Sequence, residues 1–265
     1  MNYTPAEQFE IARVLARMTG VLSRNFGVLA VLALVLSGLP SLIIAMVERG
    51  FLSSLHTGLM GLFGFGWLLS LLIGALLQAA LIHGTISDLN GRRASIGDCL
   101  NTAVRHVLPL IGIGIAMTVA TFLGLFLFIV PGVILALALC VSAPVRVVEG
   151  LDVFSSLGRS GDLTRNHRGA ILLLFILFGI GTFVLQALLG LVFGSNLIGI
   201  SRATGDELAM ERSFIAAFDL RTMVINPLFQ SLGALVGAAG VASIYFELRT
   251  IKEGIGIEAL AAAFD

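Results

Sequence analysis

Five long stretches of this 265-residue chain contain no Asp, Glu, Lys, Arg or His. They cover residues 25–47, 57–82, 107–145, 169–201 and 222–246. A helix needs about 20 mostly apolar residues to cross the hydrocarbon core of a bilayer. Hydrophobic residues make up 57% of the chain and charged residues 12%, which leaves too few polar side chains to cover a soluble globular surface. The sequence therefore predicts an integral membrane protein.

The stretch 107–145 is too long for one spanning helix and suits two. Pro131 cannot donate an N–H to a continuing helix, and Gly132 tolerates turn conformations, so we expect a tight helical hairpin at these residues. Pro40 and Pro144 are expected inside spans, where neighbouring groups must satisfy the carbonyls that they free. Six spans are predicted, near 26–47, 58–82, 107–129, 132–149, 170–194 and 225–247. The first follows a polar-rich segment and has the length of a span, unlike a cleaved signal peptide.

Basic residues are distributed unevenly between the two sides that six spans define. The side with both termini carries 12 Lys and Arg, and the other side carries 4. The positive-inside rule then places both termini in the cytoplasm. Carboxylates follow the same distribution, 11 against 5, so the inner side is rich in paired charge rather than strongly basic. The formal net charge of +0 does not suggest a nucleic-acid partner.

An internal threefold pattern accompanies the spans. An amphipathic segment precedes each odd-numbered span, beginning at Thr4, at Ser95 and near Asp152, and a short segment ending in glycine follows each even-numbered span. These glycines are Gly91, Gly150 and Gly254. The predicted fold is an all-α bundle of six transmembrane helices with three amphipathic helices at the cytoplasmic interface. It forms one membrane domain, 1–265, built from units of about 4–91, 92–150 and 151–256. A further interfacial helix is expected after Thr204.

Charged side chains gather at the predicted cytoplasmic ends of the spans. Two interpretations stay open: a ring of ion pairs that joins the three units, or a contact for a lipid phosphate. Arg146 and Glu149 are three residues apart, which allows an ion pair on one helix. The candidate residues are Arg92, Arg93, Arg146, Glu149, Glu247, Arg249, Lys252 and Glu253.

Motifs of catalysis and cofactor binding are not found in the sequence. It has no Gly-x-Ser-x-Gly elbow, P-loop or dinucleotide fingerprint, and we expect no cofactor. No predicted span has Asp or Glu in its interior, which disfavours an ion-coupled transporter. His83, His106 and His167 share the cytoplasmic side, but no two histidines have metal-ligand spacing on one helix, so no metal site is expected.

Several motifs carry a resemblance to a known family over about residues 80–256. They are Pro131-Gly132-Val133-Ile134-Leu135 with Ala143-Pro144-Val145 and Val148-Glu149-Gly150, Ser156-Leu157-Gly158-Arg159-Ser160 with Leu163-Thr164-Arg165-Asn166, Tyr245-Phe246-Glu247-Leu248-Arg249 with Lys252-Glu253-Gly254, and the weaker Asn90-Gly91-Arg92. The sequence resembles the YciC-like six-span proteins of bacterial inner membranes. It is also similar to the membrane domain fused to some glycerophosphodiester phosphodiesterases. The resemblance implies a six-helix membrane domain and no particular reaction.

Three functions follow as hypotheses. The first is a non-enzymatic membrane protein that acts on lipids or on envelope organisation, with membrane lipids as its partners. The second is a transporter or flippase for a small amphipathic or lipid molecule, and the least favoured third is an intramembrane enzyme. A lateral groove lined by Gln78, Gln186 and Arg146 would favour the second, whereas a packed centre would favour the first. A protein partner or a homo-oligomer stays open.

Overall fold

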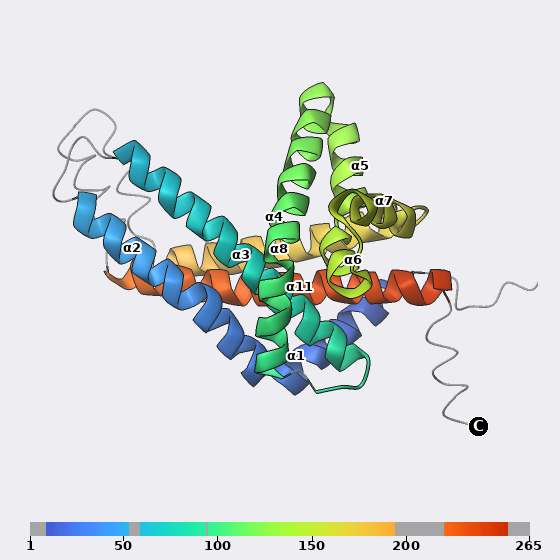
Figure 1. Cartoon of the computed structure of the whole chain (residues 1–265), viewed down its shortest axis with the longest axis horizontal. Helices are drawn as coiled ribbons and strands as arrows, with labels where there is room; N and C mark the ends of the chain where they lie inside the picture. Colours follow the sequence, from blue (N-terminus) through green and yellow to red (C-terminus); the bar gives the residue numbers. More distant parts are fainter. Residues whose placement is uncertain (1–8, 53–58, 94, 194–219, 254–265) are drawn as a thin grey trace, which may run out of the picture.

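The computed structural model describes residues 9–52, 59–93, 95–193 and 220–253, and every secondary-structure element in this part of the chain is a helix (Figure 1). The helices are α1 (Ile11–Ala33), the π-helical turn η2 (Leu34–Gly38), α2 (Leu39–Leu52), α3 (Leu59–Leu89), α4 (Ile96–Leu127), α5 (Ile129–Leu139), α6 (Ser142–Glu149), α7 (Val153–Thr164), α8 (Arg168–Phe193) and α11 (Leu220–Glu253). The predicted all-α class is confirmed for these residues.

Six helical segments are long and apolar enough to cross a membrane, counted over the residues that the structure describes. They are Ile11–Ile44, Leu69–Leu89, Ile96–Leu127, Ile129–Glu149, Arg168–Leu185 and Pro227–Glu253. Each overlaps one of the six predicted spans, so the predicted number and order of spans are confirmed. These segments indicate a multi-pass membrane protein.

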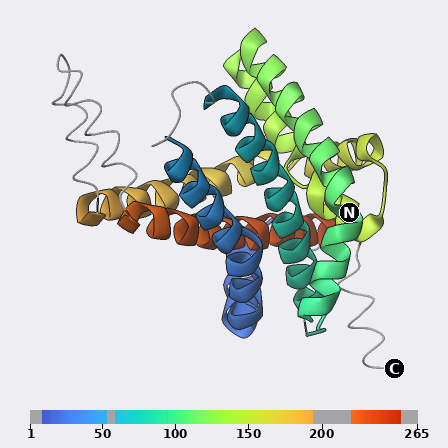
Figure 2. The ribbon, with the colours of Figure 1, turned by 60° about the vertical axis from the view of Figure 1, so that its left-hand side comes forward.

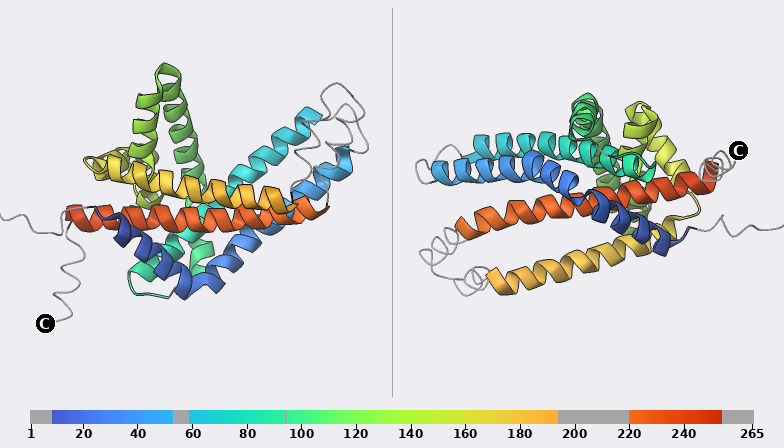
Figure 3. Two further views of the ribbon diagram at one scale, coloured as in Figure 1. Left: turned by 180° about the vertical axis from the view of Figure 1, so that it is seen from behind. Right: turned by 90° about the horizontal axis from the view of Figure 1, so that it is seen from below.

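The spans form three pairs that extend from a common centre in different directions. Figures 1 and 2 show α2 beside α3 and α4 beside α5, while Figure 3 shows α11 between the α2/α3 pair and α8. In the most apolar window of each odd-numbered span, 22%, 17% and 11% of the residues are buried, against 50% in every even-numbered span. The second helix of each pair therefore supplies the packed centre, and the first faces outward with apolar side chains suited to lipid.

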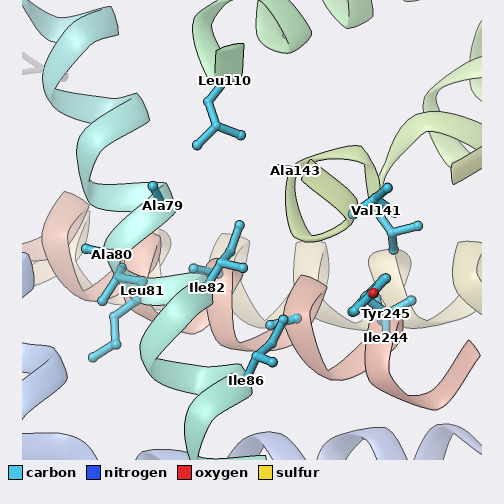
Figure 4. Packing of buried hydrophobic residues seen from close by; sticks show 14 of the residues in the cluster. Ala79, Ala80, Leu81, Ile82, Ile86, Leu110, Val141, Ala143, Ile244 and Tyr245 are labelled. Atoms are coloured by element: carbon cyan, nitrogen blue, oxygen red, sulfur yellow. The ribbon is translucent and has the colours of Figure 1, made fainter. Parts of the chain in front are cut away.

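The centre itself is apolar. Ala79 and Ala80 of α3 are fully buried, as are Ile244 of α11 and Val141 between α5 and α6. Figure 4 shows these side chains between α3, α6 and α11, with the Tyr245 ring beside Ile244. The small alanines allow α3 to approach its neighbours closely, which is how membrane helices associate where the hydrophobic effect between them is weak.

The first span begins at a kink. Asn25 has non-helical backbone angles (φ −120°, ψ 18°) inside α1, at the start of the uncharged stretch. Further along, the Leu39 N–H donates to the Leu34 carbonyl, five residues back, and this π-helical bond lies next to Pro40. A π turn shifts the hydrogen-bond register by one residue, which accommodates a proline that lacks its own N–H.

The second hairpin turns earlier than the sequence predicted. The break lies at Phe128 (φ −161°, ψ 150°), and Pro131 and Gly132 both lie inside α5. The prediction of a turn at Pro131-Gly132 is wrong, because proline is tolerated in the first turn of a helix, where its missing N–H would have no partner. Gly132 instead allows a close approach: an added Cβ would lie 2.6 Å from the Leu125 backbone nitrogen.

The return leg of this hairpin is two helices rather than one. α5 ends at Leu139, and α6 begins at Ser142 after a short turn. Pro144 lies inside the fourth span, Ile129–Glu149, as predicted, and it stands in the first turn of α6, where its missing N–H would have no helical partner. Both predicted glycine turns that can be observed are left-handed, Gly91 at φ 74° and Gly150 at φ 68°. Gly254 lies outside the described residues.

The amphipathic segments differ from one another. The start expected at Thr4 and the helix expected after Thr204 lie outside the described residues. The second segment is not a separate helix, since α4 runs without a break from Ile96 to Leu127. The third is α7, which begins at Val153, beside the start predicted near Asp152, and its N-cap Asp152 accepts a hydrogen bond from the Ser155 N–H (3.2 Å). Hydrogen bonds from the Ser155 side chain and backbone N–H lower the pKa of the Asp152 carboxyl.

Candidate functional site: a charged network at one end of the bundle

A fully buried carboxylate, Glu247 of α11, is the centre of the first part of the network. Arg17 of α1 donates to its Oε2, and Arg13 Nη1 lies 3.0 Å from its Oε1 in an ion pair that is not aligned as a hydrogen bond. Both arginines lie on one face of α1, four residues apart. The Arg17 guanidinium also stacks 5.0 Å above the Phe246 ring, a cation–π contact that fixes its position. These contacts hold α1 against α11.

The second part of the network surrounds Glu149 at the end of α6. The Tyr245 hydroxyl donates to Glu149 Oε1 (2.9 Å), and Arg159 Nε of α7 donates to Oε2 (3.1 Å). The Arg159 guanidinium also pairs with Glu253, which accepts from Arg249 Nε at 2.7 Å. Three helices, α6, α7 and α11, are thus joined through one arginine and two carboxylates. Tyr245 is 1% exposed and the Glu149 side chain 16%, so most of the bond between them is shielded from water.

Two further contacts complete the charged end. The Lys252 ammonium donates to the Asp162 backbone carbonyl, which joins α11 to α7 again. On the other side of α1, Asp88 at the end of α3 accepts from Arg24 Nη2 (2.5 Å) and from Asn25 Nδ2 (2.5 Å). Asn25 is the residue at the kink, so the bond to Asp88 fixes the place where α1 bends into the first span.

The structure brings five of the eight predicted site residues into this network and leaves three outside it. Glu149, Glu247, Arg249, Lys252 and Glu253 belong to it. Arg92 and Arg93 are exposed beside the Gly91 turn, with no ion pair to any described residue. Arg146 does not pair with Glu149: its Nη1 donates to the carbonyls of Gly150 (2.8 Å) and Leu151. That prediction is wrong, because the Arg146 side chain reaches the free carbonyls at the end of its own helix.

Sequence reasoning missed the partners of the network. Arg13 and Arg17 lie in the amphipathic segment that begins at Thr4, and Arg159 and Tyr245 lie in the motifs that carry the resemblance, so the sequence assigns none of them to the charged site. The local signal for the first two was their shared helix face, but nothing local points to Glu247, which is 230 residues from Arg17. We expected no Asp or Glu in the interior of a span. Glu247 is the last residue of the predicted sixth span, but it is fully buried and lies inside the observed span Pro227–Glu253.

The histidines do not converge on one point. His167 lies beside the Phe9 ring (centroids 6.1 Å apart), and burial together with the nearby Lys252 lowers its pKa. His106 instead lies near His83 and Arg146. No group of three possible metal ligands occurs among the described residues. Each carboxylate of the network is paired with at least one arginine, so the arrangement can hold helices together.

Comparison with known proteins adds no relative: no family model matches the sequence, and neither a curated protein nor a solved structure is similar enough to match.

Replacement of Tyr245 by phenylalanine is expected to lower the free energy of unfolding by about 2 kcal/mol, because a buried hydrogen bond to the charged Glu149 is lost. Thermal or denaturant unfolding of the purified protein in detergent measures the effect. The control is Thr118→Val, since the Thr118 hydroxyl bonds only to the Gly114 carbonyl of its own helix (2.7 Å). Equal stabilities of the two variants would contradict a role for Tyr245 in joining α11 to α6.

Proposed function

We propose that this chain is a non-enzymatic multi-pass protein of the bacterial inner membrane that acts on lipids or on the organisation of the envelope. The observation that carries the proposal is the packed apolar centre of α3, α6 and α11, held at one end by ion pairs. A helix bundle fixed in this way suits a protein that presents stable surfaces to lipids or partners. The resemblance to the YciC-like proteins supports the same proposal.

The arrangement of three similar units forms part of the proposal. Two features support units of about 4–91, 92–150 and 151–256. The second span of each pair is half-buried while the first is peripheral. Gly91 and Gly150, which end the first two units, adopt the same left-handed conformation at equivalent places. In this proposal both termini lie in the cytoplasm, so the charged network lies at the inner face of the membrane.

The alternative is a transporter or flippase for a small amphipathic or lipid molecule. One observation favours it: Gln78 is exposed on α3, within a segment long and apolar enough to span a membrane. A polar side chain that faces outward at this depth could line a lateral path. The side chain of Gln186, expected on the same path, lies outside the described residues.

Reconstitution separates the two functions. The full chain is placed in vesicles of phosphatidylethanolamine and phosphatidylglycerol that contain a fluorescent lipid, and quenching of the outer leaflet is followed over time. We expect translocation no faster than in protein-free vesicles, together with phospholipid that stays bound to the purified protein in native mass spectrometry. Rapid quenching of inner-leaflet lipid would support the flippase instead, and complete absence of retained lipid would overturn the lipid-associated function.

A further inference from the structure

Three basic residues outside the charged network, His83, His106 and Arg146, lie on α3, α4 and α6, which contact one another. The charged neighbours that act on the His106 imidazole are Arg146, His83 and Arg105, and all three are bases. None of the ion pairs formed by the described residues includes any of these four groups. The arginines of the charged network have carboxylate partners, whereas this group of bases has none among the described residues.

Two atoms of this group are buried with no hydrogen-bond partner among the described residues, Arg146 Nε and His106 Nδ1. The Arg146 guanidinium is fixed by the bonds from its Nη1 to the carbonyls of Gly150 and Leu151, which leave Nε without an acceptor. A buried polar group without a partner is costly, and a charged one more so. An acceptor with negative charge would satisfy the Arg146 Nε–H and an Nδ1–H of the His106 imidazole together.

The depth of the group is defined by the apolar layer next to it. Figure 4 shows Ala79 of α3, Leu110 of α4 and Ala143 of α6 around one part of the packed centre. His83, His106 and Arg146 each lie about one helical turn from these residues, on the same helix faces. Ala79, Leu110 and Ala143 lie inside uncharged stretches of the sequence. The three basic residues lie just outside those stretches, at the end of the bundle with the charged network. The basic group thus lies at the border of the apolar region, where lipid headgroups are found.

We infer that His83, His106 and Arg146 form a binding site for the phosphate group of an anionic membrane lipid. A phosphate offers several acceptor oxygens with negative charge, which match the N–H donors of a guanidinium and of imidazole rings. An inorganic phosphate ion has the same chemistry, but the depth of the site favours a phosphate that is attached to acyl chains. The inference rests on the proposed function, and it names the residues that would hold the lipid.

The test uses the full chain in nanodiscs of phosphatidylglycerol and phosphatidylethanolamine in equal amounts, with native mass spectrometry of the released protein. We expect wild type to retain phosphatidylglycerol preferentially. His106→Gln and Arg146→Gln should each lower the ratio of bound phosphatidylglycerol to phosphatidylethanolamine by about tenfold, the effect of one lost charge-assisted hydrogen bond. The matched control is His167→Gln, which changes a histidine outside the group and should leave the ratio at the wild-type value.

The outcomes separate the site from the function. If wild type retains phosphatidylglycerol and both variants keep the wild-type ratio, the site is refuted and the proposed function stands. If wild type retains no phospholipid, the proposed function itself fails. If inorganic phosphate alone raises the unfolding midpoint of wild type but not of His106→Gln, while no phosphatidylglycerol preference exists, the ligand is a soluble anion and the inference is overturned. Arg146→Gln also removes a hydrogen bond to the Gly150 carbonyl at the end of α6 and can disturb that helix. His106→Gln leaves this bond in place, so it tests the site without changing α6.

Discussion

Replacement of both Arg13 and Arg17 by glutamine is expected to lower the free energy of unfolding by about 3–5 kcal/mol, because Glu247 would stay fully buried without a compensating charge. A change of this size corresponds to a fall in the unfolding midpoint on the order of 10 °C for a chain of this length. Each single replacement should have a smaller effect, since the other arginine still faces the carboxylate. Thermal unfolding in detergent, followed by tryptophan fluorescence, measures the midpoint.

Neutralising the carboxylate provides the decisive comparison. When Glu247→Gln is added to the double variant, much of the lost stability should return, because a neutral amide costs far less to bury than an unpaired carboxylate. Arg92→Gln is the control for the loss of an arginine, since Arg92 is exposed. The interpretation fails if the double variant is no less stable than Arg92→Gln, or if Glu247→Gln gives no recovery.

The spans were the part of the fold that the sequence predicted well. Freedom from charge over about 20 residues is a local property, and a membrane imposes it on every helix that crosses. The helices extend beyond the predicted spans at several ends, as α3 does from Ile82 to Leu89, because a helix can continue past the apolar region. Composition marks the apolar core of a span rather than the end of its helix.

Turns were predicted less well, because proline and glycine each have more than one role. Proline can lie inside a long helix, as Pro109 and Pro227 do, or in the first turn, where it is favoured and where Pro131 and Pro144 lie. Glycine supplies left-handed backbone at Gly91 and Gly150, whereas Gly132 is helical and supplies space. The residue type alone does not distinguish these uses, since the distinction depends on what packs against the position.

The charged site shows a similar division between local and distant information. Its location at the ends of the spans follows from the distribution of charge, and five of its members were predicted. The pairing of those members was not, because Glu149 contacts Tyr245 across 96 residues and Arg159 across 10. Arg146 is the basic residue nearest to Glu149 in the sequence, but its side chain donates instead to the carbonyls of Gly150 and Leu151. Helix packing, which a single sequence does not specify, decides which charges meet.

Close packing within the second hairpin provides the other large expected effect. Gly132 of α5 lies against α4 so closely that an added Cβ would be 2.5 Å from Leu125 Cγ and 2.6 Å from its backbone nitrogen. From the opposite side, a Cβ on Gly124 would lie 2.8 Å from the Gly132 Cα. A backbone atom cannot move aside as a flexible side chain can, so any larger residue must separate the two helices.

Gly132→Ala is therefore expected to destabilise the protein by about 3 kcal/mol, at the upper end of the usual cost of overpacking. The control is Gly114→Ala in the same helix pair, because no atom lies within 4 Å of the Cβ that it would add. Since alanine favours the helix over glycine by about 1 kcal/mol, the control should be neutral or slightly stabilised. Unfolding in detergent compares the two variants with wild type. If Gly132→Ala is as stable as Gly114→Ala, the close approach of α4 and α5 at Gly132 does not exist in the folded protein.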